Sequence, residues 1–291
     1  MQVLHARSER HTTPIRGRVF LTKQIHLEKI KLAIFDVDGT LYPGISNGVL
    51  TRIFLRKIFR SLDKDALTAF ESAYLKMKMQ REQIIGVAYG DFRTGDLLTT
   101  SDTSSLDLRM LSVIEDEPVL IKLALIKAGI GGKLADRVYH EAKIEFLRDR
   151  GIVVPGINDE VYEVLRLLGR MPKVVATNST IQTAEEILKM LGVYNEFEKI
   201  YELCKKPSGL IEVLVGLLER KRVDPHEAIY IGDSYGLEII VARALGIPSI
   251  YISRGADEKT LHKLTREEGA QAPALVIAQT MNEVARYLDR S

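Results

Sequence analysis

The stretch from Lys31 to Thr40, KLAIFDVDGT, constrains this chain more than any other part of its sequence. A short apolar run ends in two carboxylates, Asp36 and Asp38, which are followed by Gly39. Such a run is typical of a strand buried on both faces, as in the centre of a parallel sheet. Open α/β sheets bind their ligands at the carboxyl ends of the strands, which is where both carboxylates would lie.

Two structural interpretations of this stretch compete with a functional one. Burying unpaired charge is costly, so a central strand has no structural use for two neighbouring acids. An Asx turn is compatible with Gly39 and Thr40, and the glycine also lets the backbone turn close to a ligand. A calcium loop of the EF-hand type needs more oxygen ligands downstream and a closing acid, and we find neither. The turn stays open as an alternative to a functional site.

Composition limits the classes of protein that could use such a site. The 291 residues suffice for one large or two ordinary domains, and 46% hydrophobic with 27% charged residues is an ordinary globular balance. A net charge of +2 gives no general electrostatic case for binding nucleic acid or a membrane. The single cysteine, Cys204, excludes an intrachain disulfide, and no apolar run approaches the roughly 20 residues that cross a bilayer. We therefore expect a cytoplasmic enzyme.

The first 29 residues have a different composition from the rest. They lack the apolar stretch of a signal peptide, and they carry three of the six histidines together with Arg7, Arg10, Arg16 and Arg18. A basic arm could touch nucleic acid, but we interpret residues 1–29 as a loose amino-terminal extension.

The chain changes character after the turn at Leu41 to Gly44. From about Asn47 to Arg150 the apolar residues follow the three-and-four spacing of amphipathic helices, and we find no convincing core strand. Gly86 to Asp107 is rich in Gly, Thr, Ser and Asp, and we interpret it as a long polar loop. The apolar stripes of the three clearest helices are Leu50, Ile53, Phe54 and Ile58; Leu67, Phe70, Tyr74 and Met77; and Ala135, Val138, Tyr139, Ala142 and Phe146.

Beyond Gly151, short apolar strands alternate with helices, which predicts an α/β fold with a parallel sheet. The first strand needs these later strands as neighbours, because parallel strands pair only across a crossover. The helical region is therefore predicted to be an insertion that forms a lid beside the end of the first strand. The later predicted strands are Lys173 to Ala176, Ala228 to Ile231, Ser249 to Ile252 and Leu275 to Ile277.

Three further polar groups follow predicted strands, namely Thr177, the Lys205-Lys206 pair and Asp233. Carboxylates that lie close together repel one another unless a hard cation joins them, and oxygen ligands suit magnesium. A lysine and a hydroxyl beside that metal would bind a dianionic phosphate, with backbone N–H groups at the Gly39 turn. One carboxylate could attack the phosphorus, and a second could protonate the leaving oxygen and later activate water.

The order and spacing of these residues resemble the haloacid dehalogenase (HAD) superfamily of phosphohydrolases. The likeness covers residues 31–44 and about 151–255, whereas the helical insertion resembles the family's C1 cap only in position and character. The family's four motifs are matched in chain order by Asp36 to Thr40; by Thr177; by Lys206 before Pro207, with Lys205 as an alternative; and by Gly232, Asp233 and Ser234 with Glu238.

The resemblance implies a role for each matched residue. Asp36 would be the nucleophile and a metal ligand, and Asp38 the general acid/base, which also binds the metal through its backbone carbonyl. Thr177 and Lys206 would hold the phosphoryl group, and Asp233 would bind Mg²⁺. Dehalogenases of the family lack the second aspartate and transport ATPases have threonine there, so Asp38 favours a phosphatase or a phosphomutase.

Five other residues are supporting candidates. Glu238 is ranked as a supporting metal ligand, because the family often has aspartate at this place. Gly39 is counted with the phosphate-binding groups through its backbone. Asn178 either binds a phosphate oxygen or caps the next helix. Tyr42 either packs beneath the insertion or contacts the substrate, and Arg52 belongs either to a solvated row of arginines or to a substrate contact.

The expected fold is α/β, with a Rossmann-like parallel sheet core flanked by helices and an inserted, mainly α-helical cap domain. The predicted domains are the extension 1–29, a discontinuous core of 30–44 with 151–291, and the cap 45–150. The expected function is a Mg²⁺-dependent phosphatase of a small phosphorylated metabolite, without nucleic-acid or membrane partners. A phosphomutase is the alternative, and a non-catalytic binding or regulatory protein is less favoured. Oligomeric state and substrate identity are left open.

Overall fold

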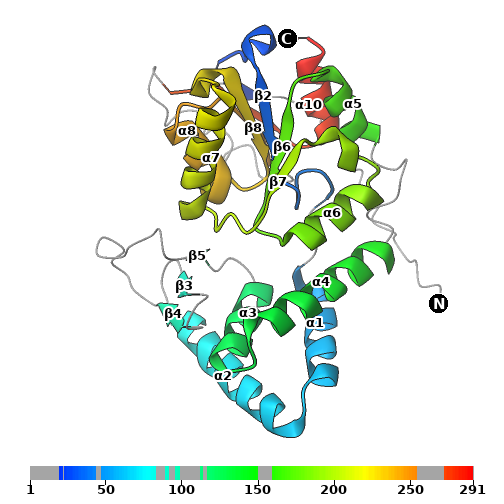
Figure 1. Ribbon diagram of the computed structural model, residues 1–291, viewed down its shortest axis with the longest axis vertical. Coiled ribbons are helices and arrows are strands. Elements are labelled where there is room, and N and C mark those ends of the chain that lie inside the picture. The colour runs from blue at the N-terminus through cyan, green and yellow to red at the C-terminus, as the bar shows by residue number, and fades with distance from the viewer. Residues whose placement is uncertain are drawn as a thin grey trace, which may run out of the picture.

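A central sheet with helices on both faces carries a helical insertion at one of its ends (Figure 1). The computed structural model describes residues 20–21, 23–43, 47–82, 89–91, 96–98, 112–113, 117–149, 159–253 and 272–290. Within these ranges, none of the helices has the length and apolar character needed to cross a membrane.

The central sheet has the strand order β1-β10-β9-β8-β2-β6-β7 over the described residues. Six of these strands are parallel, and β1 pairs antiparallel with β10 at the edge. The first long strand, β2, lies between β6 and β8, and all four of its residues are buried. The bounds are β1 Phe20–Leu21, β2 Leu32–Phe35, β6 Lys173–Ala176, β7 Lys199–Tyr201, β8 Ala228–Gly232, β9 Ser249–Ile252 and β10 Leu275–Ala278.

Alternate residues of β2 face two different helix layers. Ala33 and Phe35 join the apolar cluster that includes residues of α5, α6 and α10, whereas Leu32 and Ile34 join the cluster formed with α7 and α8. Figure 1 shows these two helix groups on opposite faces of the sheet. The bounds are α5 Asp159–Leu167, α6 Ile181–Met190, α7 Ser208–Lys221, α8 Ile240–Ala244 and α10 Met281–Leu288, with short 3₁₀ turns at Leu27–Lys29, Tyr194–Glu196 and Pro225–Glu227.

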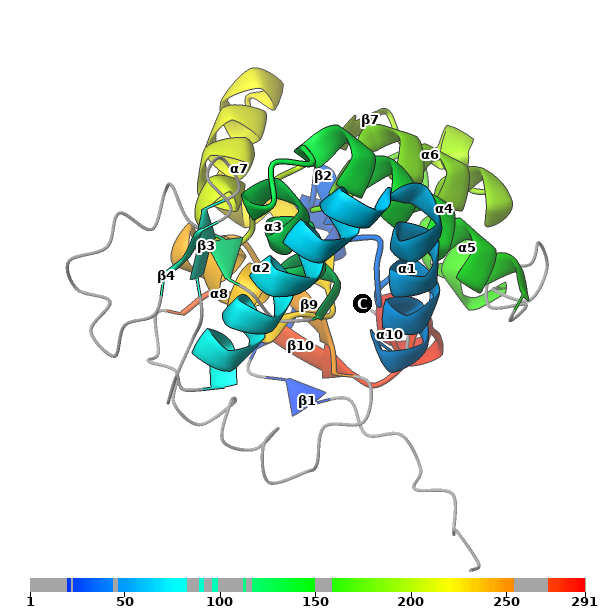
Figure 2. The same ribbon diagram turned by 90° about the horizontal axis from the view of Figure 1, so that it is seen from below.

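In its described residues, the insertion is built mainly from helices α1 to α4, which lie across one end of the sheet (Figure 2). Helix α2 packs against α3, and α1 and α3 pack against α4. The last of these helices, α4, also contacts α6 of the core. The bounds are α1 Asn47–Ser61, α2 Lys64–Glu82, α3 Glu117–Lys127 and α4 Gly132–Asp149.

The interpretation of Gly86 to Asp107 as one polar loop is wrong for two segments. Strands β3 (Tyr89–Asp91) and β4 (Asp96–Leu98) lie within it, and with β5 (Ser112–Val113) they form a small antiparallel sheet. The other residues of that stretch lie outside the described part of the chain. Strands of two or three residues are too short to show an alternating apolar pattern, so only their pairing reveals them.

The five predicted core strands are confirmed, but two edge strands were not predicted. Strand β7 has three residues that are half-buried or exposed, and it therefore lacks the apolar signature of the central strands. Strand β1 has only two residues and lies within the predicted extension 1–29. Ile25 from the same segment is also buried, and its backbone N–H donates to the Tyr287 hydroxyl at 2.7 Å. The end of this segment thus packs on the core.

Candidate active site

Asp36 and Asp38 follow β2 directly but occupy different backbone environments. The Asp36 N–H donates to the Ile231 carbonyl at 3.0 Å and so continues the ladder between β2 and β8. The chain then turns, with the Leu41 N–H donating to the Val37 carbonyl at 3.0 Å. Asp38 lies in this turn. The first carboxylate is therefore anchored to the sheet and the second projects from the turn beyond it.

The strand order brings the other matched residues to the same edge of the sheet. Thr177 follows β6 and Asp233 follows β8, which are the two neighbours of β2. Lys206 lies in the loop between β7 and α7. Its ammonium is 2.6 Å from Asp36 Oδ1, and the side chain is only 2% exposed. Lys205, the alternative that the sequence left open, is exposed.

Three carboxylates gather beside this lysine. The oxygens of Asp36, Asp233 and Glu238 lie within 4.8 Å of one another. Lys206 donates to Glu238 as well as to Asp36. The backbone at Gly39 passes so close that a Cβ there would lie 1.7 Å from Asp233 Oδ2, and its φ of +79° also favours glycine. The conformation of this turn is thus tied to the position of Asp233.

Glu238 reaches this group from a π-helical turn, η5 (Tyr235–Ile239), that precedes α8. The Ser234 carbonyl accepts from the N–H groups of both Glu238 and Ile239, each at 3.2 Å. The Ser234 N–H in turn donates to Glu238 Oε2 at 3.4 Å. Turns of this kind are frequent at functional sites. The glutamate is thus buried beside Asp36 and Asp233.

Burial dominates the electrostatics of these acids. It raises the pKa of Asp36, with a further contribution from the charge of Asp38, although the Lys206 ammonium opposes the shift. Burial together with Asp36 raises the pKa of Glu238 well above its usual value. Lys206 is itself desolvated, yet the charges of Asp36 and Glu238 hold its pKa well above the ordinary one. Asp36 and Glu238 thus share one buried ammonium.

This donor set fits a hard divalent cation. Three carboxylates whose oxygens lie this close repel one another when all are ionised, and a divalent cation between them would relieve that repulsion. Carboxylate oxygens are the ligands that hard cations prefer. Asp36, Asp233 and Glu238 could therefore hold a metal ion, with Asp36 as a member of both the ligand set and the lysine pair.

Asp38 has a separate set of partners that the sequence analysis did not identify. The Lys143 ammonium lies 2.6 Å from its Oδ1 and 2.7 Å from its Oδ2, and the Ser179 hydroxyl donates to Oδ2 at 3.0 Å. The Tyr42 hydroxyl also donates to Asp38. Burial alone would raise the pKa of Asp38, but Lys143 with these two hydroxyls lowers it overall.

One signal in the sequence pointed to Lys143. Helix α4 has an apolar face that includes Tyr139 and Phe146, and Lys143 lies on that face, four residues after the first and three before the second. It is 2% exposed. A lysine within an apolar stripe needs an acidic partner, since an unpaired buried ammonium is unstable. Only the fold shows that this partner is Asp38.

A sequence-family comparison matches residues 30–246 to the haloacid dehalogenase-like hydrolases. The chain belongs to this family. A glyceraldehyde 3-phosphate phosphatase from Methanopyrus kandleri is 24% identical to this hydrolase over 237 residues, which cover 78% of this chain and 85% of that protein.

Solved structures of HAD proteins align along most of the hydrolase at low sequence identity. A HAD-hydrolase from Bacillus subtilis bound to magnesium has a TM-score of 0.49 and 14% identity, covering 89% of this chain and 99% of that one. A HAD phosphatase from Thermococcus onnurineus has a TM-score of 0.47 and 16% identity, covering 89% and 98%.

In the second motif of the hydrolase, Thr177 and Asn178 make contacts within the protein, and those of Asn178 differ from one interpretation of the sequence. Thr177 is fully buried, and its Oγ1 accepts from the Ser179 N–H at 3.1 Å. The interpretation of Asn178 as a helix cap is wrong, because the N-cap of α6 is Thr180. Asn178 Oδ1 instead accepts from the Lys206 N–H at 2.9 Å, which joins the second motif to the third.

Tyr42 and Arg52, the two candidates for substrate contact, differ in their surroundings. Tyr42 is 1% exposed and belongs to the large apolar cluster, with its hydroxyl on Asp38. This burial agrees with the interpretation that Tyr42 packs beneath the insertion, and a substrate contact of Tyr42 stays a prediction. Arg52 on α1 is exposed, as the solvated interpretation expects. A substrate contact of Arg52 stays a prediction.

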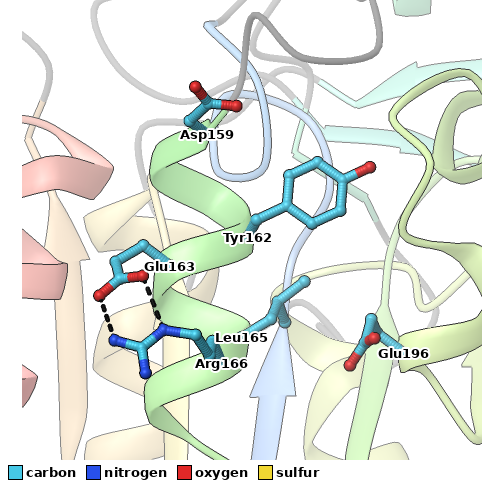
Figure 3. A pocket seen from close by; sticks show the side chains of 6 residues that line it. All are labelled: Asp159, Tyr162, Glu163, Leu165, Arg166 and Glu196. Carbon is cyan, nitrogen blue, oxygen red and sulfur yellow. Dashed lines mark hydrogen bonds and ion pairs between the residues drawn. The ribbon is translucent and has the colours of Figure 1, made fainter.

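A surface hollow beside α5 is separate from this site (Figure 3). Its volume is about 520 Å³, and it is lined by Asp159, Tyr162, Glu163, Leu165, Arg166 and Glu196. The guanidinium of Arg166 binds Glu163 through two contacts of 2.8 and 2.6 Å. Since the remaining charges are acidic, the hollow does not suit a phosphate ester.

Proposed function

We propose that this hydrolase is a Mg²⁺-dependent phosphatase of small phosphorylated metabolites. The observation that carries the proposal is that Asp36 and Asp38 contact different sets of side chains. Asp36 lies in the cluster of acidic side chains beside Lys206. Asp38 instead lies among Lys143, Tyr42 and Ser179. Two acids with different surroundings suit two different roles in one reaction. The phosphatase name of the Methanopyrus kandleri relative supports the same assignment.

In the first half of the proposed reaction, Asp36 is the nucleophile. A carboxylate oxygen of Asp36 forms a bond to the phosphorus, and the bond between phosphorus and the ester oxygen breaks. Protonated Asp38 gives its proton to that oxygen, which leaves as an alcohol. The phosphoryl group remains on Asp36 as an aspartyl phosphate.

In the second half, Asp38 acts as the base. Its carboxylate removes a proton from a water molecule, and the water oxygen attacks the phosphorus. The bond between phosphorus and Asp36 breaks, so inorganic phosphate and the Asp36 carboxylate are released. Asp38 is protonated again at the end of the cycle. Thr177 and Lys206 would hold the phosphoryl group through both halves.

Magnesium would be held by Asp36, Asp233 and Glu238, together with the backbone carbonyl of Asp38. When bound, the cation would neutralise charge on the phosphoryl oxygens. Helices α1 to α4 would act as a cap over the site, in a domain of about residues 45–150, and limit the access of water. No motif in the insertion identifies the substrate.

The test is phosphate release from a panel of phosphate monoesters, with Mg²⁺ and with a chelator. Sugar phosphates, nucleoside monophosphates, phosphoglycolate and glyceraldehyde 3-phosphate belong in the panel. We expect release from at least one of them, lost on chelation and restored by Mg²⁺. Release that continues in the chelator would contradict the proposed metal. Isomerised substrate with little free phosphate would instead identify a phosphomutase.

Gly39→Ala is expected to weaken Mg²⁺ binding by about tenfold or more, the range seen when groups that support metal ligands are changed. The new methyl group would displace Asp233, against which a Cβ has only 1.7 Å. Isothermal titration calorimetry with Mg²⁺ measures the change.

Gly129→Ala is the matched control for this substitution. Gly129 has a φ of +76°, close to that of Gly39, but a Cβ there would meet no atom within 4 Å. Both variants should lose about 1 kcal/mol of stability through backbone strain. Only Gly39→Ala should lose Mg²⁺ affinity. Equal affinity in the two variants would show that the Gly39 turn does not influence Mg²⁺ binding.

A further inference from the structure

Lys143 joins the helical insertion to the aspartate that the proposed reaction uses as acid and base. It comes from α4, whereas its partners Asp38 and Ser179 belong to the core. Its ammonium contacts both carboxylate oxygens of Asp38, at 2.6 and 2.7 Å, and the Ser179 hydroxyl at 2.9 Å. The insertion thus contacts Asp38 and Ser179 of the core through the charged side chain of Lys143.

The burial of this pair is uneven in a way that suits catalysis. Lys143 is only 2% exposed, whereas the Asp38 side chain keeps 38% of its surface exposed. The ring of Tyr139, on the same helix, lies 5.9 Å from the ammonium. Lys143 is therefore enclosed, whereas part of the Asp38 side chain is open to a substrate or a water molecule.

Helix α4, which carries Lys143, contacts α6 of the core. His140 Nδ1 lies 2.9 Å from Thr183 Oγ1, and its Nε2 lies 3.1 Å from Glu186. Arg148 also pairs with Glu186, at 2.7 Å. These contacts fasten α4 on both sides of Lys143 along the helix. Ser179, the other partner of Lys143, lies just before α6.

We propose that Lys143 is a positioning residue, which holds the Asp38 carboxylate in its working orientation when α4 is seated on α6. This inference rests on the proposed phosphatase function. It gives each aspartate its own lysine, Lys206 from the core for Asp36 and Lys143 from the insertion for Asp38. An insertion that is not seated would leave Asp36 intact and Asp38 without its support.

A positioning role and a general structural role of Lys143 predict different effects on the two halves of the reaction. With p-nitrophenyl phosphate, the leaving nitrophenolate needs no proton, so the attack by Asp36 does not depend on Asp38. Hydrolysis of the aspartyl phosphate does depend on it, because a water molecule must give up a proton. Loss of Lys143 should therefore slow the second half and spare the first.

The experiment is rapid-mixing kinetics of the full chain with p-nitrophenyl phosphate and Mg²⁺. For Lys143→Met we expect a first turnover of nitrophenolate within about threefold of wild type, and a steady-state rate lower by about tenfold or more. Asp38→Asn should show the same pattern. A first turnover that falls together with the steady state, or a steady state that does not fall, would overturn the proposal.

Lys122→Met is the matched control. Lys122 lies in the same insertion, pairs with Asp136 at 2.6 Å and lies 5.3 Å from the same Tyr139 ring, but its partners are outside the site. Both of its rates should equal those of wild type. A steady-state rate that falls as far in Lys122→Met as in Lys143→Met would overturn the proposal, because any lost lysine would then suffice.

Ser179→Ala keeps the proposal testable if Lys143→Met does not fold. It removes a hydroxyl that binds both Lys143 and Asp38 from the core side. We expect the same separation of the two rates, with a smaller loss, and equal losses in both rates would overturn the proposal. A wild type that releases no nitrophenolate, or an Asp38→Asn variant that lacks the pattern, would instead reject the proposed function.

Discussion

Asp36→Asn is expected to lower phosphate release by about 10⁴-fold or more, as when other enzymes lose their nucleophile. An amide cannot attack phosphorus to form a stable phosphoenzyme. The backbone of Asp36 continues the ladder between β2 and β8, so its side chain has a fixed place at the edge of the sheet. Glu238, another acid beside Asp36, comes from a different element and is bound by Lys206 and Ser234. A colorimetric phosphate assay on the best substrate measures the loss.

Asp65→Asn is the control, since Asp65 is an exposed acid in the first turn of α2. It should retain wild-type activity. Acid quenching with labelled substrate gives a second measurement, in which wild type carries label on the protein and Asp36→Asn does not. Asp36→Asn with near-wild-type turnover would reject Asp36 as the nucleophile and with it the proposed mechanism.

Lys206→Met is expected to remove both activity and stability. Its ammonium is the buried positive charge that contacts Asp36 and Glu238. Breaking a buried ion pair by removing one partner costs about 3–5 kcal/mol, because the other charge is left uncompensated. Unfolding in urea should show a loss of that order, and phosphate release should fall by about 10³-fold through loss of the phosphoryl contact.

Lys205→Met is the matched control for Lys206→Met, because it removes the adjacent lysine, which is exposed. It should change the free energy of unfolding by less than about 0.5 kcal/mol, as surface substitutions usually do. Saturating Mg²⁺ should restore part of the stability of Lys206→Met, by about 2.7 kcal/mol at one hundred times the dissociation constant. Mg²⁺ should not restore phosphate release. If it restored both stability and phosphate release, the role of Lys206 would be only to compensate the charge of the acids.

The strand pattern carried most of the fold. Strands buried on both faces are continuous apolar runs, so β2, β6, β8, β9 and β10 could be predicted from the sequence. The edge strand β7 could not, because its residues are partly exposed and give no such run. The three short strands of the insertion were also beyond reach, since each is defined by its partners rather than by its own residues.

The cluster of acidic side chains beside Lys206 could be predicted because its members follow strands in a regular way. Asp36 and Asp233 each follow a buried strand, and the edges of a parallel sheet bring such positions together. The choice between Lys205 and Lys206 required the structure, because adjacent residues in a loop can point in opposite directions. The partner of Asn178 required it for the same reason.

The sequence by itself determined the central strand, the two aspartates at its end and the motifs that place this chain among the HAD-like hydrolases. These features are local, since apolar runs and the residues that end them are read along the chain. The tertiary structure decided how the two aspartates differ. Lys143 is 105 residues from Asp38 in sequence and reaches it where α4 of the insertion packs against the core. A contact made across two packed elements has no counterpart in the spacing of residues along either one.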